Sequence, residues 1–249
     1  MAAIIERPDP APLTDDPSSP GGDRFVATSL FLLAGVLLGF QVLISELIPP
    51  LVVTSVMVVA FGTALLRRRR RWLLITVIVV AVLQLAGSMP FIVSNLAHPE
   101  SPLSFIVEAF TVLATLSAAL GAAAGLRGAA TGSRRPIAVG AGGLALIAVV
   151  VSLFAASGVG SDTMQVGDVT IEAEMAHFPE HVEVPVGAAI YADNRDPVRH
   201  TLVIEGTDVH VEMPASTAVR VEADLAPGTY RYFCDVPGHE RMEGQLDVG

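Results

Sequence analysis

The chain has 249 residues, of which 52% are hydrophobic, and a formal net charge of −10. Its mean hydropathy of +0.59 is too high for an ordinary soluble protein of this length, so membrane segments are sought first. All 15 basic residues are arginines, and no pattern among them requires phosphate or DNA. Nucleic-acid binding is therefore not expected.

Charge divides the chain into two regions. Residues 161–249 contain 17 acidic residues and 5 arginines, whereas residues 1–160 contain 8 acidic residues and 10 arginines. The single cysteine, Cys234, excludes an internal disulfide framework, so this thiol has to be explained by packing, redox chemistry or a metal.

The first region combines a polar tail with a series of apolar stretches. Residues 1–24 are rich in Pro, Asp, Ser and Gly, which predicts a disordered tail that is not a signal peptide. Each apolar stretch is near the ~20 residues that cross a bilayer core. The stretches cover residues 25–46, 49–66, 72–95, 103–126 and 136–157. They predict a transmembrane α-helical bundle of five helices over residues 25–158.

The arginines predict how this bundle is oriented. Arg67 to Arg71 lie between the second and third stretches, and further arginines at 127, 134 and 135 lie between the fourth and fifth. Arginine-rich short connections face the cytoplasm, and the other two connections contain no Lys or Arg. We therefore expect a multi-pass protein of the cell membrane with a cytoplasmic N-terminus. Everything after about residue 158 is expected on the extracytoplasmic side.

From about residue 164 the pattern changes to short alternating segments separated by turn residues. Val, Ile or Tyr recurs at every second position with acidic residues between, as in strands that face water on one side. The segments are VTIEAEM, HVEVPVG, AIYADN, TLVIEG, TAVRVEADL, TYRYFC and GQLDV. Their spacing predicts a small antiparallel β-sandwich or barrel over residues 164–249.

The end of this β region holds a set of side chains that bind metals. Cys234, His239 and Met242 lie within nine residues of one another, and His200 stands just before the segment TLVIEG. A type 1 copper site requires one thiolate and two imidazoles, with a weak axial thioether. The chain offers this set of ligands once.

On these residues the sequence resembles the cupredoxin family, specifically its plastocyanin-like members, over about residues 164–249. The matching motifs are Phe178-Pro179 before HVEVPVG, N-x-D-x-x-x-H at Asn194, Asp196 and His200, G-x-Y-x-[FY]-x-C from Gly228 to Cys234, P-G-H at Pro237 to His239, and M-x-G-x-L from Met242 to Leu246. The resemblance implies a Greek-key β-sandwich that binds one type 1 copper ion. It also implies that His200, Cys234 and His239 are the equatorial ligands and Met242 the axial ligand.

The metal-binding loop departs from the family in one respect. Only Glu240 and Arg241 separate His239 from Met242, and plastocyanin-like domains with the P-G-H turn usually have a longer spacing. The short spacing resembles that of the copper domain of cytochrome oxidase subunit II, whose binuclear centre needs two bridging cysteines. A single cysteine excludes a binuclear site here, and the departure bears on the axial contact of Met242.

Several other polar or aromatic side chains have simpler explanations. Three histidines match no ligand position and are expected on solvated strands or turns: His177, His181 and His210. Tyr230 and Tyr232 share a strand face with Cys234 and are expected to pack in the core. Glu46, His98 and Glu108 fall near the predicted outer ends of their helices, where water reaches them. Anchoring is the minimal role of the bundle.

The function expected from these patterns is one-electron transfer without catalysis. Copper would exchange electrons with a membrane or extracytoplasmic redox partner, such as a cytochrome or an oxidase, and the acidic surface would steer it toward a basic partner. The alternative is copper delivery or sensing, although no Met or His cluster lies outside the proposed site. A copper oxidase or nitrite reductase would need further histidine-rich centres, and no H-x-H pair occurs. A metal-free interaction domain would not need all four ligands.

Overall fold

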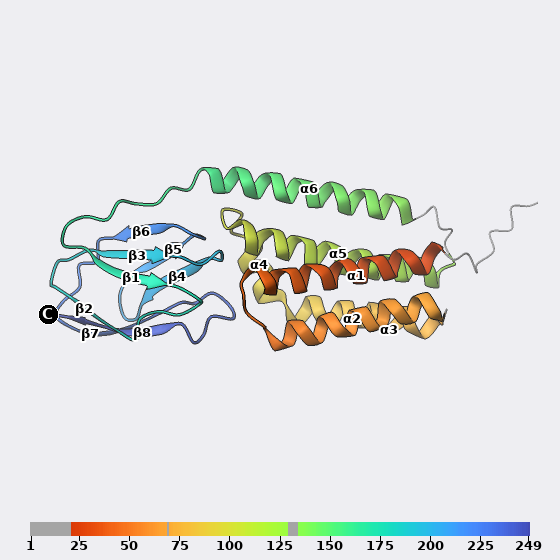
Figure 1. Ribbon diagram of the computed structural model, residues 1–249, viewed down its shortest axis with the longest axis horizontal. Helices are drawn as coiled ribbons and strands as arrows, with labels where there is room; N and C mark the ends of the chain where they lie inside the picture. Colours follow the sequence, from red (N-terminus) through yellow and green to blue (C-terminus); the bar gives the residue numbers. More distant parts are fainter. Residues whose placement is uncertain (1–20, 69, 129–133) are drawn as a thin grey trace, which may run out of the picture.

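The computed structural model describes residues 21–68, 70–128 and 134–249, so residues 1–20 of the predicted tail lie outside it. The described chain forms a helical bundle and a β-sandwich that lies beyond one end of the bundle (Figure 1).

The bundle consists, within the described residues, of six helices. They are α1 (Gly21–Leu43), α2 (Pro49–Arg67), α3 (Arg71–Gly87), α4 (Met89–Leu96), α5 (Pro102–Leu126) and α6 (Arg135–Ser157). Helices α1, α2, α5 and α6 are long and apolar enough to cross a membrane, and α3 and α4 together are a candidate fifth span. Prolines stand in the first turn of α2, α4, α5 and α6, where the backbone N–H has no partner within the helix.

The third apolar stretch is not one continuous helix. Its two parts, α3 and α4, are bent by 61° relative to each other at Ser88. Gly87 and Pro90 flank this position, and a proline inside a helix both lacks the N–H donor and clashes with the preceding turn. The stretch over residues 72–95, expected to be one helix, therefore contains two helices joined by a bend.

Helix α5 lies at the centre of the bundle and contacts α1, α3, α4 and α6. Its small residues allow this close packing: a Cβ at Gly121 would lie 2.7 Å from the ring of Phe25 in α1. Helix α6 packs on α5 and turns large apolar side chains such as Leu146 and Phe154 outward. An apolar outer surface of this kind is what a lipid environment accommodates.

The β-sandwich contains eight strands in two sheets. They are β1 (Val169–Ala173), β2 (His181–Val184), β3 (Ile190–Asn194), β4 (His200–Ile204), β5 (His210–Met213), β6 (Ala218–Val221), β7 (Gly228–Phe233) and β8 (Glu243–Val248). One sheet has the order β1-β3-β6 and the other β2-β8-β7-β4-β5. Each of the segments expected to be a strand contains one.

The sheets are mixed, whereas the sequence predicted antiparallel sheets. Strand β1 pairs with β3 in parallel, and β2 pairs with β8 in parallel, whereas the β4–β5, β4–β7, β7–β8 and β3–β6 pairs are antiparallel. Alternation along a strand reports which face is buried and carries no information on the direction of its neighbour. For this reason the parallel pairs could not be seen in the sequence.

Apolar side chains from both sheets meet in one core. Ile171 and Ile190 from one sheet and Leu202, Tyr232 and Leu246 from the other are fully buried there. Burial of each large side chain stabilises the fold by about 1.5–3 kcal/mol. Cys234 and Met242 belong to the same core.

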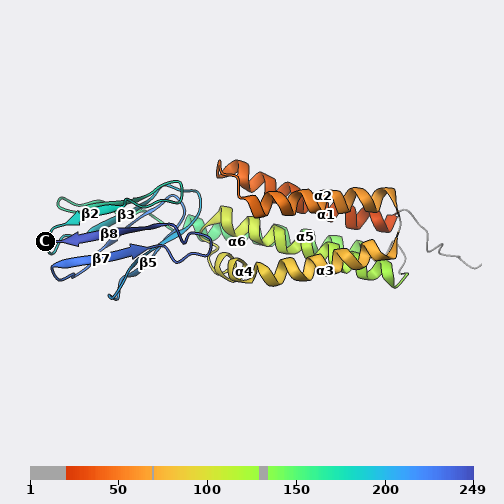
Figure 2. The same ribbon diagram turned by 90° about the horizontal axis from the view of Figure 1, so that it is seen from below.

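The direction of the strands decides where the predicted metal ligands lie. Strand β7 runs toward the bundle and β8 runs away from it (Figure 2). Cys234 follows the end of β7, and His200 begins β4, which is antiparallel to β7. Both residues therefore lie at the end of the sandwich that faces the helices.

Candidate metal centre

Two separate segments bring the sulfur and the two imidazoles together. His200 is the first residue of β4, whereas Cys234 and His239 belong to the loop between β7 and β8. Backbone hydrogen bonds close this loop: Met242 donates to His239 at 2.8 Å, His239 to Val236 at 3.0 Å and Cys234 to Met242 at 2.9 Å. The loop is thus a compact turn whose ends are held by the sheet.

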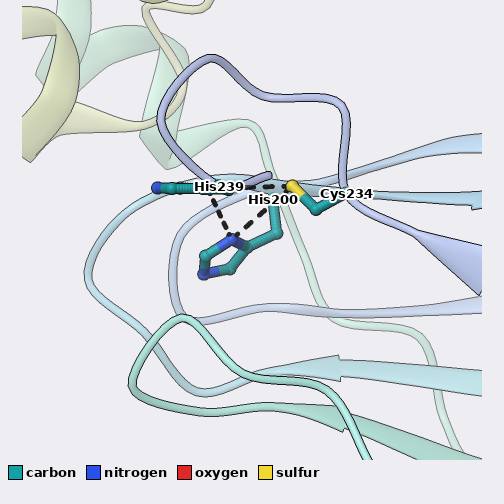
Figure 3. A group of neighbouring side chains, drawn as sticks. All are labelled: His200, Cys234 and His239. Carbon is teal, nitrogen blue, oxygen red and sulfur yellow. Dashed lines mark hydrogen bonds between the residues drawn. The ribbon is translucent and has the colours of Figure 1, made fainter. Parts of the chain in front are cut away.

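The three side chains form a small triangle (Figure 3). Nδ1 of His200 lies 3.1 Å from Nδ1 of His239, and Sγ of Cys234 lies 3.9 Å and 3.7 Å from these two nitrogens. His200 and Cys234 are buried, and His239 is partly exposed. Among the described residues, these three side chains are the group that lies close enough together to hold a metal ion.

The triangle has the size that a metal ion requires. A point equidistant from the three atoms in their plane lies about 2.1 Å from each, and metal bonds to imidazole nitrogen and thiolate sulfur measure about 2.0–2.3 Å. One thiolate and two imidazoles in a plane are the donor set of a type 1 copper site. The residues therefore fit a copper ion.

The surroundings of Cys234 favour the thiolate, which is the form that binds metals. Burial raises the pKa of Cys234, but hydrogen bonds with His200, His239 and Thr201 outweigh it and lower the pKa to about 5. The backbone N–H of Thr201 lies 3.4 Å from the sulfur. The Thr201 hydroxyl lies 3.6 Å from the sulfur and 2.7 Å from the Asp235 carboxylate, so it also ties β4 to the loop.

The Asp196 carboxylate orients the imidazole ring of His200. Oδ2 of Asp196 lies 2.8 Å from Nε2 of His200, on the side of the ring away from the sulfur. This contact leaves Nδ1 to face the metal position, as second-layer partners do for most metal-binding histidines. Burial lowers the pKa of His200, but the hydrogen bonds with Asp196 and Cys234 outweigh it, and the pKa is raised above its ordinary value.

Asp196 is itself held by a strained turn. The backbone N–H groups of Met175 and Ala176 donate to its carboxylate at 2.7 Å and 2.8 Å, and both residues adopt a φ of 53°. Non-glycine residues rarely adopt such a φ, which costs on the order of 1–3 kcal/mol each. Burial raises the pKa of Asp196, but the contacts with His200, Ala176 and Met175 outweigh it and keep the pKa below its ordinary value.

The sequence places Asp196 in a family motif and does not indicate its role. The signal that could have identified it is its position four residues before His200, in a segment that leads into a strand. Asn194 in the same motif supports the backbone: its amide donates to the carbonyls of Val198, Met213 and Pro214, each at 2.9 Å. These bonds anchor the segment that carries Asp196 and His200.

Met242 lies in the core, and the remaining histidines of the β-sandwich lie apart from the triangle. The Met242 side chain is buried in the core beside Cys234, and its axial ligation stays a prediction. The three other histidines of the β-sandwich lie outside the triangle: His181 pairs with Asp247 at 3.3 Å, His210 pairs with Asp235 at 3.4 Å, and His177 contacts the Met175 carbonyl at 2.6 Å. Tyr232 is fully buried, as expected of a core residue.

Comparison with known proteins assigns the fold of the β region. Residues 144–248 match the family model of the cupredoxin-like domain, which begins within α6 and covers the whole sandwich. No curated protein matches the chain in sequence.

Several solved structures are similar to this region. Amicyanin from Paracoccus versutus is 19% identical, with a TM-score of 0.31 over 36% of this chain and 90% of amicyanin. Auracyanin B is 20% identical, with a TM-score of 0.29 over 37% of this chain and 95% of auracyanin. A Cu-containing nitrite reductase from Thermus scotoductus is 25% identical, with a TM-score of 0.29, and the match spans 37% of this chain and 24% of the reductase. The C-terminal part of the chain is thus a cupredoxin-like domain, joined to helices that are apolar enough to span a membrane.

Proposed function

We propose that this protein is a membrane-anchored type 1 copper protein that transfers one electron at a time on the extracytoplasmic side. His200, Cys234 and His239 would hold the copper ion, and Met242 would be the weak axial ligand. The observation that carries the proposal is the triangle of two imidazole nitrogens and one thiolate sulfur, of the size that a metal ion requires.

The β-sandwich supplies rigidity to these ligands. When bound, copper supplies a centre that cycles between Cu(II) and Cu(I). His200 is held by Asp196, and Cys234 by Thr201 and the loop backbone, so their positions need not change between the two states. Little reorganisation of the protein would accompany each electron, which suits a carrier that breaks no bond of a substrate.

The distribution of arginines supports the proposed orientation. The connections that contain Arg67, Arg68, Arg127 and Arg134 lie at the end of the bundle away from the β-sandwich (Figure 1). A cytoplasmic position of this end, as the positive-inside rule favours, puts the cupredoxin-like domain outside. The five spans that this orientation requires include the bent pair of α3 and α4.

We propose that the copper ion exchanges electrons with another redox protein and not with a substrate bound to this chain. Within the described residues, no second group of three metal-binding side chains accompanies the triangle, and an oxidase or reductase would need one for its substrate. The excess of acidic residues in 161–249 would steer the domain toward a basic surface, such as that of a cytochrome or an oxidase.

Spectroscopy of the full chain in detergent with added Cu(II) tests the proposal. We expect an intense absorption near about 600 nm and a narrow copper hyperfine splitting, both lost in Cys234→Ser and kept in the surface control His210→Ala. Weak and colourless binding, or binding that Cys234→Ser leaves unchanged, would contradict electron transfer. Copper delivery or sensing would then be the better function.

A further inference from the structure

The metal end of the β-sandwich rests on the outer end of the bundle. Gly238, which precedes His239 in the loop, packs so closely on α4 that a Cβ at Gly238 would lie 3.1 Å from the ring of Phe91. Figure 3 shows the helices close to the loop that carries His239. One proposed ligand is therefore the chain neighbour of a residue in contact with α4.

The neighbour of the other histidine ligand also contacts α4. Arg199, which precedes His200, has a side chain that is 6% exposed. Its Nη2 donates to the hydroxyl of Ser94 in α4, and its Nη1 donates to Glu212 in β5 at 2.7 Å. Burial of a guanidinium is unfavourable unless it is paired, so partners from both the bundle and the β-sandwich indicate a specific contact.

The loop after α4 adds two further contacts. Nε2 of His98 lies 3.8 Å from Glu212, so this carboxylate is shared between His98 and Arg199. The hydroxyl of Ser101, a fully buried residue, accepts a hydrogen bond from the backbone N–H of Ala215 at 3.3 Å. Polar contacts thus extend from Ser94 to Ser101 on one side. On the other side they involve Arg199 before β4, Glu212 in β5 and Ala215 in the turn after β5.

The linker after α6 makes a second set of contacts with the domain. The Ser161 hydroxyl accepts a hydrogen bond from the N–H of Ala218, and the N–H of Asp162 donates to the Ala218 carbonyl. The Asp162 carboxylate accepts the N–H of Arg220 at 2.8 Å. The linker therefore joins the edge strand β6, and the β-sandwich is attached to the bundle through two sets of contacts.

From these contacts we infer that residues 89–101 form a dock that holds the metal end of the β-sandwich against the outer end of the bundle, with Arg199 as its anchoring residue. The inference rests on the proposed function for its significance. The dock holds the start of β4, which carries His200, and the loop that carries His239 at the membrane surface. A redox partner must then reach the metal at the membrane surface and not at the far end of the domain.

Disulfide trapping in the full chain, reconstituted in nanodiscs, tests the dock. The pair Ser101→Cys and Ala215→Cys is placed at the contact, in a Cys234→Ser background that leaves no other cysteine. A protease site inserted after Gly160 then cuts the linker. We expect the two fragments to remain joined on a non-reducing gel. Ser101→Cys with Thr229→Cys, at the far end of β7, is the control that should separate.

Loss of the anchoring arginine gives the second readout. Arg199→Ala should slow formation of the disulfide tenfold or more, because Ser94 and Glu212 lose their shared donor. Arg195→Ala removes an exposed arginine of the same domain that pairs with Asp193 and Glu172, and should leave the rate unchanged. Trapping no faster than in the control pair, or a rate insensitive to Arg199→Ala, would overturn the inference.

The design separates this inference from the copper assignment. Trapping needs no metal, so a dock without blue copper would leave the inference standing and the proposed function refuted. Blue copper without trapping would give the reverse result. The same cysteine pair in a chain that keeps Cys234, read by mass spectrometry of the digest, covers the case in which Cys234→Ser unfolds the sandwich.

Discussion

Replacement of Asp196 by asparagine tests how the protein sets the potential of the metal. The Asp196 carboxylate is nearly buried and lies 2.8 Å from Nε2 of His200. Asparagine keeps the size of the side chain and can still bond the ring, but it removes the negative charge. That charge stabilises Cu(II) more than Cu(I), since Cu(II) carries one more positive charge. We therefore expect the reduction potential of Asp196→Asn to rise.

The size of this shift follows from the geometry. Across the imidazole of His200, the Asp196 carboxylate is on the order of 7 Å from the centre of the ligand triangle, so one unit charge is worth about 2 kcal/mol at an effective dielectric constant of about 20. For a one-electron couple a tenfold change in the equilibrium constant is about 59 mV. The expected rise is therefore roughly 100 mV.

Redox titration of the full chain, followed by the visible absorption of the copper thiolate, measures the shift. Asp193→Asn is the matched control: Asp193 lies three residues earlier in the sequence, pairs with Arg195 at 3.0 Å and does not contact His200. The role given to Asp196 is refuted if its variant shifts no more than the control, or shifts downward.

Three further predictions concern the sulfur and its neighbours. Because the pKa of Cys234 is lowered to about 5, the metal-free protein should keep its thiolate absorbance at pH 7. This ionisation stabilises the fold fully above the ordinary thiol pKa, and the stabilisation is lost as the pH falls toward 5. Denaturant unfolding at a series of pH values should show this loss. Met242→Leu should keep the blue absorption but raise the potential in redox titration, whereas the equally buried Met213→Leu should not. Thr201→Val should lower the free energy of unfolding by about 1 kcal/mol through loss of the Asp235 contact, with the blue absorption retained in the visible spectrum.

Local patterns in the sequence were sufficient for much of the architecture. Period-two alternation located seven of the eight strands, all but β5, and hydropathy located the helices, because each depends on residues close together in the chain. The bend at Ser88 was missed because a hydropathy window averages over it. Gly87 and Pro90 were the local signal that could have revealed it.

The grouping of His200, Cys234 and His239 was predictable from the sequence for a similar reason. Cys234 and His239 lie in one short loop, and His200 stands at the start of a recognisable strand. The hydrogen bonds that orient these side chains were not predictable in the same way. Asp196 depends on the turn at Met175 and Ala176, twenty residues away, and alternation does not report which backbone N–H groups such a turn aims at a carboxylate.

The same two segments serve the metal site and the dock. Arg199 and His200 are adjacent in one segment, and Gly238 and His239 are adjacent in the other. Contacts with α4 thus restrain the backbone on which each histidine is carried. If metal binding and docking each restrain these segments, each must favour the other by the same free energy, because coupling between two binding events is reciprocal. The bundle would then contribute to the affinity for the metal as well as anchor the domain.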